Sequence, residues 1–143
     1  MTVIPYEEPF RDDMIYMVLD AKNALGKVPT INPDLLDIGG SYLARGDCFW
    51  LALDDDRRVI GCIGFSTLDE ENARLHRLYV KPTMKRQGIG STLLRTAEEE
   101  LRHRGVRYAS VHLGGKEYWE SRIFYPKMGY CEYEPGYMRK ELL

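Results

Sequence analysis

This sequence has no long apolar segment and only a small imbalance of charge. No apolar run is long enough to cross a bilayer, and residues 1–5 have neither the basic region nor the apolar core of a signal peptide. The net charge of −2 argues against a general nucleic-acid or membrane surface. We therefore expect a cytoplasmic protein that binds neither nucleic acid nor membrane.

Cysteine and histidine are also scarce. The cysteines Cys48, Cys62 and Cys131 are odd in number and widely spaced, which predicts free thiols and no disulfide framework. The histidines lack metal-ligand spacing as well, so no metal site is expected. At 143 residues, the chain has the length of one domain, residues 1–143, and can bury a core.

Glycine is placed with a pattern in the segment Lys85-Arg86-Gln87-Gly88-Ile89-Gly90-Ser91. This segment joins an alternating, β-rich stretch, residues 73–80, to an apolar helical pattern that begins at Ile89 and ends before Gly105. Two glycines at a helix start leave bare N–H groups at the positive end of the helix dipole. Lys85 and Arg86 add full charges. The loop predicts a site for phosphate or pyrophosphate, built largely from backbone.

Two common phosphate-binding signatures do not match this loop. A dinucleotide fold would have a third glycine where this chain has Leu93, and its loop would lie in a leading βαβ unit. A P-loop needs Gly-Lys followed by Ser or Thr, which is absent. A glycine-rich turn that binds nothing is the structural alternative.

The spacing resembles the Arg/Gln-x-x-Gly-x-Gly/Ala signature of the GNAT superfamily of N-acetyltransferases, with Lys85 in the leading position. Before the loop, Leu78–Pro82 is similar to the acetyl-CoA-binding strand of that family. After it, Phe124–Tyr130 resembles the family's FYxKxGF segment and Tyr137–Leu142 its closing strand. The similarity runs from about Phe49 to the C-terminus.

The resemblance implies an α/β fold of the mixed α+β kind. A twisted central sheet of six to seven strands, mixed but mostly antiparallel, would be flanked by about four helices, and a splayed strand pair would form the CoA cleft. The chain patterns predict strands over residues 2–6, 48–53, 59–67, 73–80, 108–113, 130–133 and 137–142. Besides the helix from Ile89, they predict helices over 10–25, 34–44 and 118–127, the second of these weakened by Gly39 and Gly40.

The resemblance also implies how acetyl-CoA, the co-substrate, would be held. Backbone groups of Leu78, Tyr79 and Val80 would hydrogen-bond its pantetheine arm. The loop would hold its pyrophosphate through Lys85, Arg86, Gln87, Gly88, Ile89, Gly90 and Ser91.

Tyr125 matches the tyrosine that protonates the departing CoA thiolate in many family members, so it is expected to contact the cofactor as well. A phenol suits this role because it is neutral at working pH and has a proton to donate. Pro126 replaces the acidic residue usual at its position and is expected to bend or end the helix. A packing role for Tyr125 is the alternative.

The base that takes the proton of the amine is less defined. His76 lies four residues before Val80, where the arylalkylamine branch of the family also has a histidine, and strand alternation places it on the face of Leu78. Imidazole titrates near neutral pH, which suits this task. A histidine hydrogen-bonded within the sheet is an equal alternative, and Glu70 and Glu71 are competing carboxylates unless they form a solvated turn.

Aromatic residues are expected to line the acceptor end of the cleft, where they would suit an amine on an apolar or aromatic body, or a peptide end. Tyr42, Phe49 and Trp50 lie where the N-terminal helices would meet it, and Tyr118 and Trp119 would cover the other side. For Phe49, core packing is the favoured role.

Together these features predict an acetyl-CoA:amine N-acetyltransferase that acts by direct transfer in a ternary complex. The acceptor would be a small-molecule amine or an amino group of a peptide or protein. A non-catalytic CoA-binding sensor or interaction module on the same fold is the alternative. The sequence leaves the acceptor, the acyl length and a homodimer open.

Overall fold

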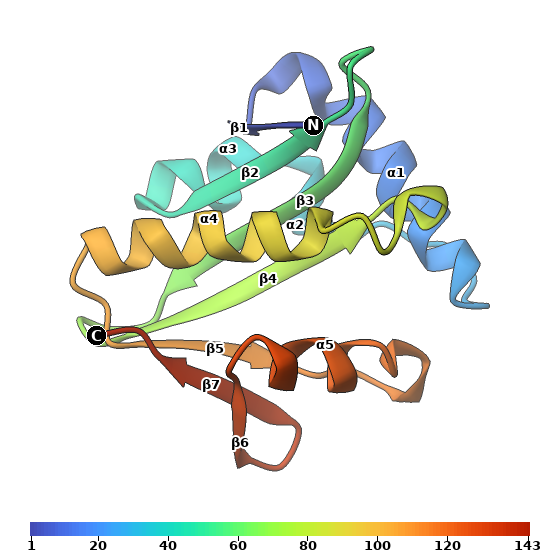
Figure 1. Cartoon of the computed structure of the whole chain (residues 1–143). Coiled ribbons are helices and arrows are strands. Elements are labelled where there is room, and N and C mark those ends of the chain that lie inside the picture. The colour runs from blue at the N-terminus through green and yellow to red at the C-terminus, as the bar shows by residue number, and fades with distance from the viewer.

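The computed structural model describes all 143 residues, and Figure 1 shows one sheet with helices packed on it. Seven strands lie in the order β1-β2-β3-β4-β5-β7-β6. Their bounds are β1 Thr2–Pro5, β2 Cys48–Leu53, β3 Val59–Thr67, β4 Asn72–Val80, β5 Tyr108–His112, β6 Cys131–Glu134 and β7 Tyr137–Glu141. Only β4 and β5 pair in parallel. The predicted mixed, mostly antiparallel sheet is confirmed.

Five α-helices accompany the sheet: α1 Arg11–Ala24, α2 Pro33–Leu36, α3 Ile38–Ser41, α4 Ile89–His103 and α5 Ser121–Lys127. Four short 3₁₀ turns lie at Glu8–Phe10, Leu43–Arg45, Pro82–Met84 and Lys116–Tyr118. No helix combines the length and the apolar composition needed to span a bilayer.

The predicted helix over residues 34–44 is wrong, because the chain breaks at Asp37. The Asp37 carboxylate accepts the N–H of Gly40 at 3.0 Å, which caps α3 and separates it from α2. A Cβ on Gly40 would collide with that carboxylate. The glycine therefore permits a cap that divides the segment into single turns.

Two apolar cores stabilise the sheet, one on each face. The stripe of α4 that the sequence predicts is fully buried and consists of Ile89, Leu93, Leu94, Ala97 and Leu101. On the other face, Met14, Met17 and Val18 of α1 pack with residues of β2 and β3. Burial of these side chains is the main source of stability, at about 1.5–3 kcal/mol for each large apolar one.

Strands β4 and β5 pair over three residues and then diverge. Their ladder joins Asn72–Arg74 to Tyr108–Ser110, and β4 runs on to Val80 with no partner on that side. The predicted splayed pair is therefore present, and Figure 1 shows the two strands separating toward the end of β4.

A bulge in the middle of β4 reverses the alternation of its side chains. The register with β3 shifts there, and Arg77 adopts a φ of 57°, in the left-handed region. Leu78 and Val80 therefore pack toward α4, whereas His76 faces Tyr42 on the α1 side. The expectation that His76 shares the face of Leu78 is wrong, because the extra residue breaks the two-residue period.

An ion pair holds the strained residue of the bulge. Arg77 donates from Nε and Nη2 to the two carboxylate oxygens of Asp34, each at 3.0 Å, and the Tyr42 hydroxyl donates to the same carboxylate at 2.6 Å. Burial alone would raise the pKa of Asp34, but these hydrogen bonds outweigh it and the pKa lies below its usual value. The pair fixes α2 against β4.

A second polar contact ties α4 to the C-terminal strands. Glu98 is 2% exposed and accepts the Tyr130 hydroxyl at 2.7 Å, and Lys140 lies 3.2 Å from the same carboxylate. Burial, followed by the charge of Glu98, raises the pKa of Tyr130. A buried carboxylate needs both partners, because each satisfies part of its lost hydration.

We predict that Tyr130→Phe lowers the free energy of unfolding by about 1.5–3 kcal/mol, the usual value of a hydrogen bond to a charged group. Chemical denaturation measures this loss. Tyr16→Phe is the control, because Tyr16 is 62% exposed and should lose almost nothing. Equal losses in the two variants would contradict a structural role for the Glu98 contact.

Candidate active site

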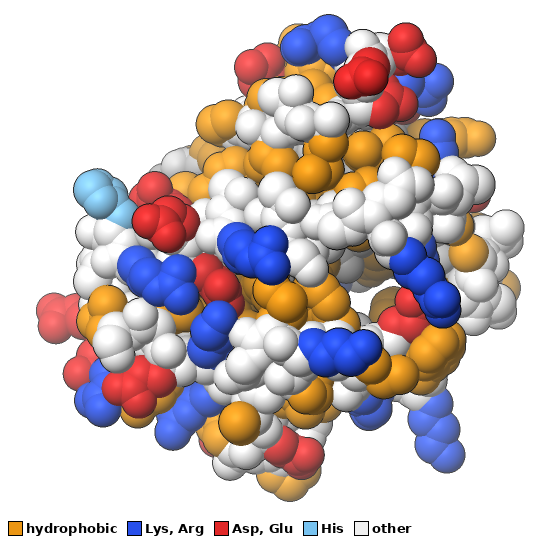
Figure 2. Space-filling model, viewed as in Figure 1, with side chains coloured by type: hydrophobic (Ala, Val, Ile, Leu, Met, Phe, Trp, Pro, Cys, Tyr) orange, Lys and Arg blue, Asp and Glu red, His pale blue; other side chains and the backbone are white.

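A cavity of about 680 Å³ opens where β4 leaves β5. The end of β4, the loop before α4 with its first turn, residues 118–127 around α5, and one side of α1 form its walls. Every residue expected to hold acetyl-CoA lines the cavity except Gln87, and His76, the expected base, does not line it either. Figure 2 shows a hollow at the right of the molecule with Lys and Arg side chains beside it.

The loop before α4 presents bare backbone to this cavity. None of the N–H groups of Gly88, Ile89, Gly90 and Ser91 has a hydrogen-bond partner in the chain, and no side chain caps the helix. Gly88 adopts a φ of 78°, which turns the chain into the helix. Four free donors at the start of a 15-residue helix are suited to an anion, because the helix dipole adds positive potential there.

The two cations of the loop have different surroundings. Lys85 Nζ lies 2.7 Å from Oε1 of Glu120, so this ion pair crosses the mouth of the cavity to the start of α5. Arg86 has no carboxylate within 4.0 Å and is exposed. The sequence pattern gave no sign of Glu120, because the pair joins residues far apart in the chain.

Tyr125 of α5 is a buried phenol whose hydroxyl has no hydrogen-bond partner in the chain. Its ring packs edge-on against Phe124 and Tyr130, and the residue is 7% exposed, with its accessible part on the cavity. Burial raises the pKa of Tyr125, so the hydroxyl keeps its proton at neutral pH. Helix α5 ends one residue after Pro126.

His76 lies outside the cavity, on the α1-side face of β4. Its Nε2 is 2.7 Å from the hydroxyl of Ser66, and its ring lies beside that of Tyr42. Burial, together with the charge of Arg77, lowers the pKa of His76, so the imidazole is neutral at neutral pH. The histidine is therefore hydrogen-bonded within the sheet and can still accept a proton.

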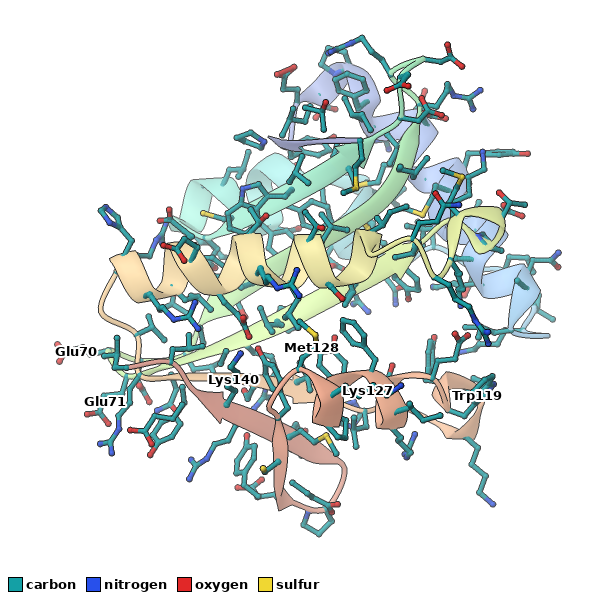
Figure 3. The ribbon with its side chains drawn as sticks, in the orientation of Figure 1. Glu70, Glu71, Trp119, Lys127, Met128 and Lys140 are labelled. Atoms are coloured by element: carbon teal, nitrogen blue, oxygen red, sulfur yellow. The ribbon has the colours of Figure 1, made fainter.

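The competing carboxylates are far from the cavity. Glu70 and Glu71 occupy the exposed turn before β4, whereas the cavity lies at the other end of that strand. Figure 3 shows Glu70 and Glu71 on the opposite side of the molecule from Trp119, which lines the cavity. They form the solvated turn that was the alternative interpretation.

The aromatic walls are only partly as expected. Tyr118 and Trp119 line the cavity, but Tyr42, Phe49 and Trp50 are core residues and do not. The expectation for Tyr42 and Trp50 is wrong, because Trp50 lies in β2, which has a packed core on each face, and Tyr42 packs against Phe49 in one of these cores. Phe49 has the core role that was favoured for it.

Helix α1 supplies a wall that sequence reasoning missed. Ala21 and Leu25 line the cavity at the end of α1, where the apolar face of the helix continues past the core. Lys27 follows, donates to the Tyr118 hydroxyl at 3.2 Å and pairs with Glu117 at 3.2 Å. This contact joins the N-terminal part of the chain to the α5 region at the cavity.

The arrangement combines three chemical functions. One end of the cavity offers backbone N–H groups suited to an anion, its walls are mostly apolar, and the hydroxyl of a neutral, largely buried phenol reaches it. It suits a ligand with phosphates and a long, weakly polar arm, and it can protonate a leaving group on that arm.

Comparisons with known proteins agree with this geometry. The family described as "Acetyltransferase (GNAT) domain" matches residues 45–132. The chain is 35% identical over 108 residues to N-acetyltransferase 8 of Homo sapiens, which covers 71% of this chain and 46% of that protein. The chain spans less than half the length of each curated relative it matches.

Solved structures show the same fold. An acetyltransferase of the GNAT family from Staphylococcus aureus Mu50 superposes with a TM-score of 0.91 at 22% identity, covering 99% of both chains. A GNAT family acetyltransferase from Brucella melitensis, in complex with acetyl-CoA, has a TM-score of 0.72 at 20% identity and covers 98% of this chain and 86% of that one.

The two loop glycines should respond differently to alanine. Gly88→Ala places a side chain at positive φ, and we expect it to lower the free energy of unfolding by about 1–2 kcal/mol. Gly90→Ala meets only Phe124 and Val80 at 3.7 Å and removes a flexible residue from a helix, so stability should stay equal or rise by up to about 1 kcal/mol. Thermal or urea unfolding measures both changes. Equal losses of unfolding free energy in the two variants would contradict this loop conformation.

Proposed function

Because the chain belongs to the GNAT family of acetyltransferases, we propose that it transfers an acetyl group from acetyl-CoA to an amine nitrogen. The observation that carries this proposal is one cavity with bare N–H groups at one end and the unpaired Tyr125 hydroxyl in its wall. The transfer is direct, within a complex of the chain, acetyl-CoA and the acceptor.

The cavity fits acetyl-CoA at two places. The N–H groups of Gly88, Ile89, Gly90 and Ser91 would receive the pyrophosphate, with Arg86 as the unpaired cation beside them and Lys85 available if it leaves Glu120. Leu78, Tyr79 and Val80 form a strand edge with no neighbour on the β5 side, where amide groups of the pantetheine arm can add hydrogen bonds. When bound, acetyl-CoA supplies an activated acetyl thioester.

Two side chains of this chain move protons in the proposed reaction. Tyr125 donates its phenolic proton to the departing thiolate sulfur as the carbon–sulfur bond breaks and the carbon–nitrogen bond forms. His76, neutral because of burial, accepts through water the proton that the amine nitrogen loses. The acetyl group passes directly to nitrogen, so no enzyme nucleophile is required.

A panel of amines mixed with acetyl-CoA tests the proposed function. Release of free CoA that depends on both chain and amine, with the acetylated amine identified by mass spectrometry, is the expected result. Calorimetric binding of acetyl-CoA without transfer to any amine would favour a CoA-binding sensor or interaction module. No binding at all would contradict both.

Gly90→Val should weaken acetyl-CoA binding at least about tenfold, because its methyl groups would occupy space that the ligand needs beside the bare N–H groups. Calorimetry measures the affinity. Gly90→Ala, with a single methyl group, should lose less. An affinity equal to that of the unsubstituted chain, in a folded Gly90→Val protein, would refute the phosphate assignment.

Tyr125→Phe keeps the ring and its packing and removes the proton donor. We expect kcat to fall about 10²–10⁴-fold with little change in acetyl-CoA affinity. Burial raises the pKa of this phenol, so it keeps its proton across the working pH range, and the loss of kcat in the variant should persist at alkaline pH. His76→Gln should instead alter the acidic limb, where the imidazole becomes protonated.

Tyr118→Phe tests a second tyrosine that lines the cavity. If Tyr118→Phe lowers kcat about 10²–10⁴-fold and Tyr125→Phe keeps kcat, Tyr118 is the proton donor and the role proposed for Tyr125 is wrong.

A further inference from the structure

No helix packs on the face of β5, β6 and β7 that lies on the α1 side of the sheet. The core on this side contains residues of α1, α2, α3 and β1–β4, and none of β5, β6 or β7. In Figure 1, α1, α2 and α3 gather beside β1–β4, away from these three strands. The side chains that β5 and β7 present here include Tyr108, Tyr137 and Arg139, which are all partly exposed.

Two arginines on this face have no acidic partner. No carboxylate lies within 4.0 Å of Arg74 or Arg139, whereas the nearby Arg107 pairs with Glu141 at 3.3 Å. Both are half-buried, and a charge that has lost part of its hydration is normally paired. Arg74 and Arg139 are therefore two half-buried cations that no carboxylate of the chain neutralises.

Tyrosine rings hold the two guanidinium groups in place. Arg74 stacks over Tyr137 at 4.7 Å, and Arg139 lies 4.2 Å from the Tyr108 ring centre and 4.7 Å from that of Tyr133. Nη1 of Arg74 and all three guanidinium nitrogens of Arg139 have no hydrogen-bond partner in the chain. Stacked guanidinium groups with free N–H donors are suited to planar, bidentate binding of a carboxylate.

The arginines lie next to the opening in the sheet. Arg74 with Ser110 is the last pair of the β4–β5 ladder, and its Nε donates to the Ser110 hydroxyl at 3.2 Å. Beyond it, β4 continues through His76, the proposed base, to the cavity end of the strand. His76 lies two residues after Arg74 along the strand, a rise of about 7 Å. An acceptor that enters from this face can place an amine near His76 and an anionic group near Arg74.

We propose that the acceptor is an amine that also carries a carboxylate, which Arg74 and Arg139 bind on this uncovered face. The inference rests on the proposed N-acetyltransferase function and names its acceptor class. Charge complementarity selects this occupant, because two unpaired cations attract an anionic amine and disfavour a polycationic one.

Matched acceptors test the carboxylate directly. Acetylation of 4-(aminomethyl)benzoate is compared with that of 4-(aminomethyl)benzamide, and 6-aminohexanoate with its amide, so that each pair differs at the carboxylate. We expect kcat/KM to be at least about tenfold higher for the acid of a pair, the usual effect of a charged hydrogen bond. Arg74→Gln and Arg139→Gln should reduce this ratio toward one. Arg107→Gln, which removes a paired arginine, should keep it.

A binding measurement decides the question without turnover. The protein with CoA is titrated with 4-methylbenzoate, which has no amine, and with 4-methylbenzamide. The acid alone should bind, and Arg139→Gln should weaken it at least about tenfold; this variant removes no side-chain hydrogen bond, so it tests the site even if Arg74→Gln does not fold.

The outcomes separate this inference from the proposed function. Acetylation of amides as fast as of acids, or equal binding of the two benzoate derivatives, overturns the carboxylate assignment and leaves the acetyltransferase proposal standing. If Arg74 and Arg139 bind a carboxylate but no amine is acetylated, the acetyltransferase proposal is contradicted instead. A dimer that Arg139→Glu dissociates, without carboxylate binding, would show that a second copy covers the face and would also overturn the assignment.

Discussion

The short pairing of β4 with β5 is the constraint on which the rest of the structure depends. Three paired residues hold the two halves of the sheet together, and beyond Arg74 the strands separate. The separation leaves a strand edge without a partner at residues 78–80 and opens the sheet between its two faces. The bulge at Arg77, held by the ion pair with Asp34, sets how β4 presents its side chains along that opening.

The two faces of the opening differ in chemistry because different elements cover them. On the α4 side, the helix start and α5 enclose an apolar cavity that ends in bare N–H groups. On the α1 side, the core ends before β5, and stacked arginine and tyrosine side chains take its place. A phosphate-bearing donor suits the first face and an anionic acceptor the second, so the two substrates would meet in the gap without competing for space.

The residues proposed to bind or react with substrates carry polar groups that have no partner in the chain. The Tyr130 hydroxyl is buried and hydrogen-bonded to Glu98, whereas the hydroxyl of the neighbouring Tyr125 has no partner in the chain and is open to the cavity. Helix starts are normally capped, yet α4 is not. Half-buried cations are normally paired, yet Arg74 is not. Each of these groups is free to pair with a ligand that supplies the matching charge or hydrogen-bonding group.

The sequence by itself determined the elements whose signals are local. The β2–β3 hairpin, the stripe of α4 and the glycine loop follow from alternation, helical spacing and backbone freedom over a few neighbouring residues. The face of His76 and the burial of Trp50 were decided only by tertiary structure. The bulge that turns His76 depends on the register of β4 with another strand. A residue that lines a cavity can be distinguished from a core residue only when the elements packed on both faces of its strand are known. The pairing of Lys85 with Glu120 and the missing partner of Arg74 likewise depend on which distant residues the fold brings together, and no local pattern encodes that.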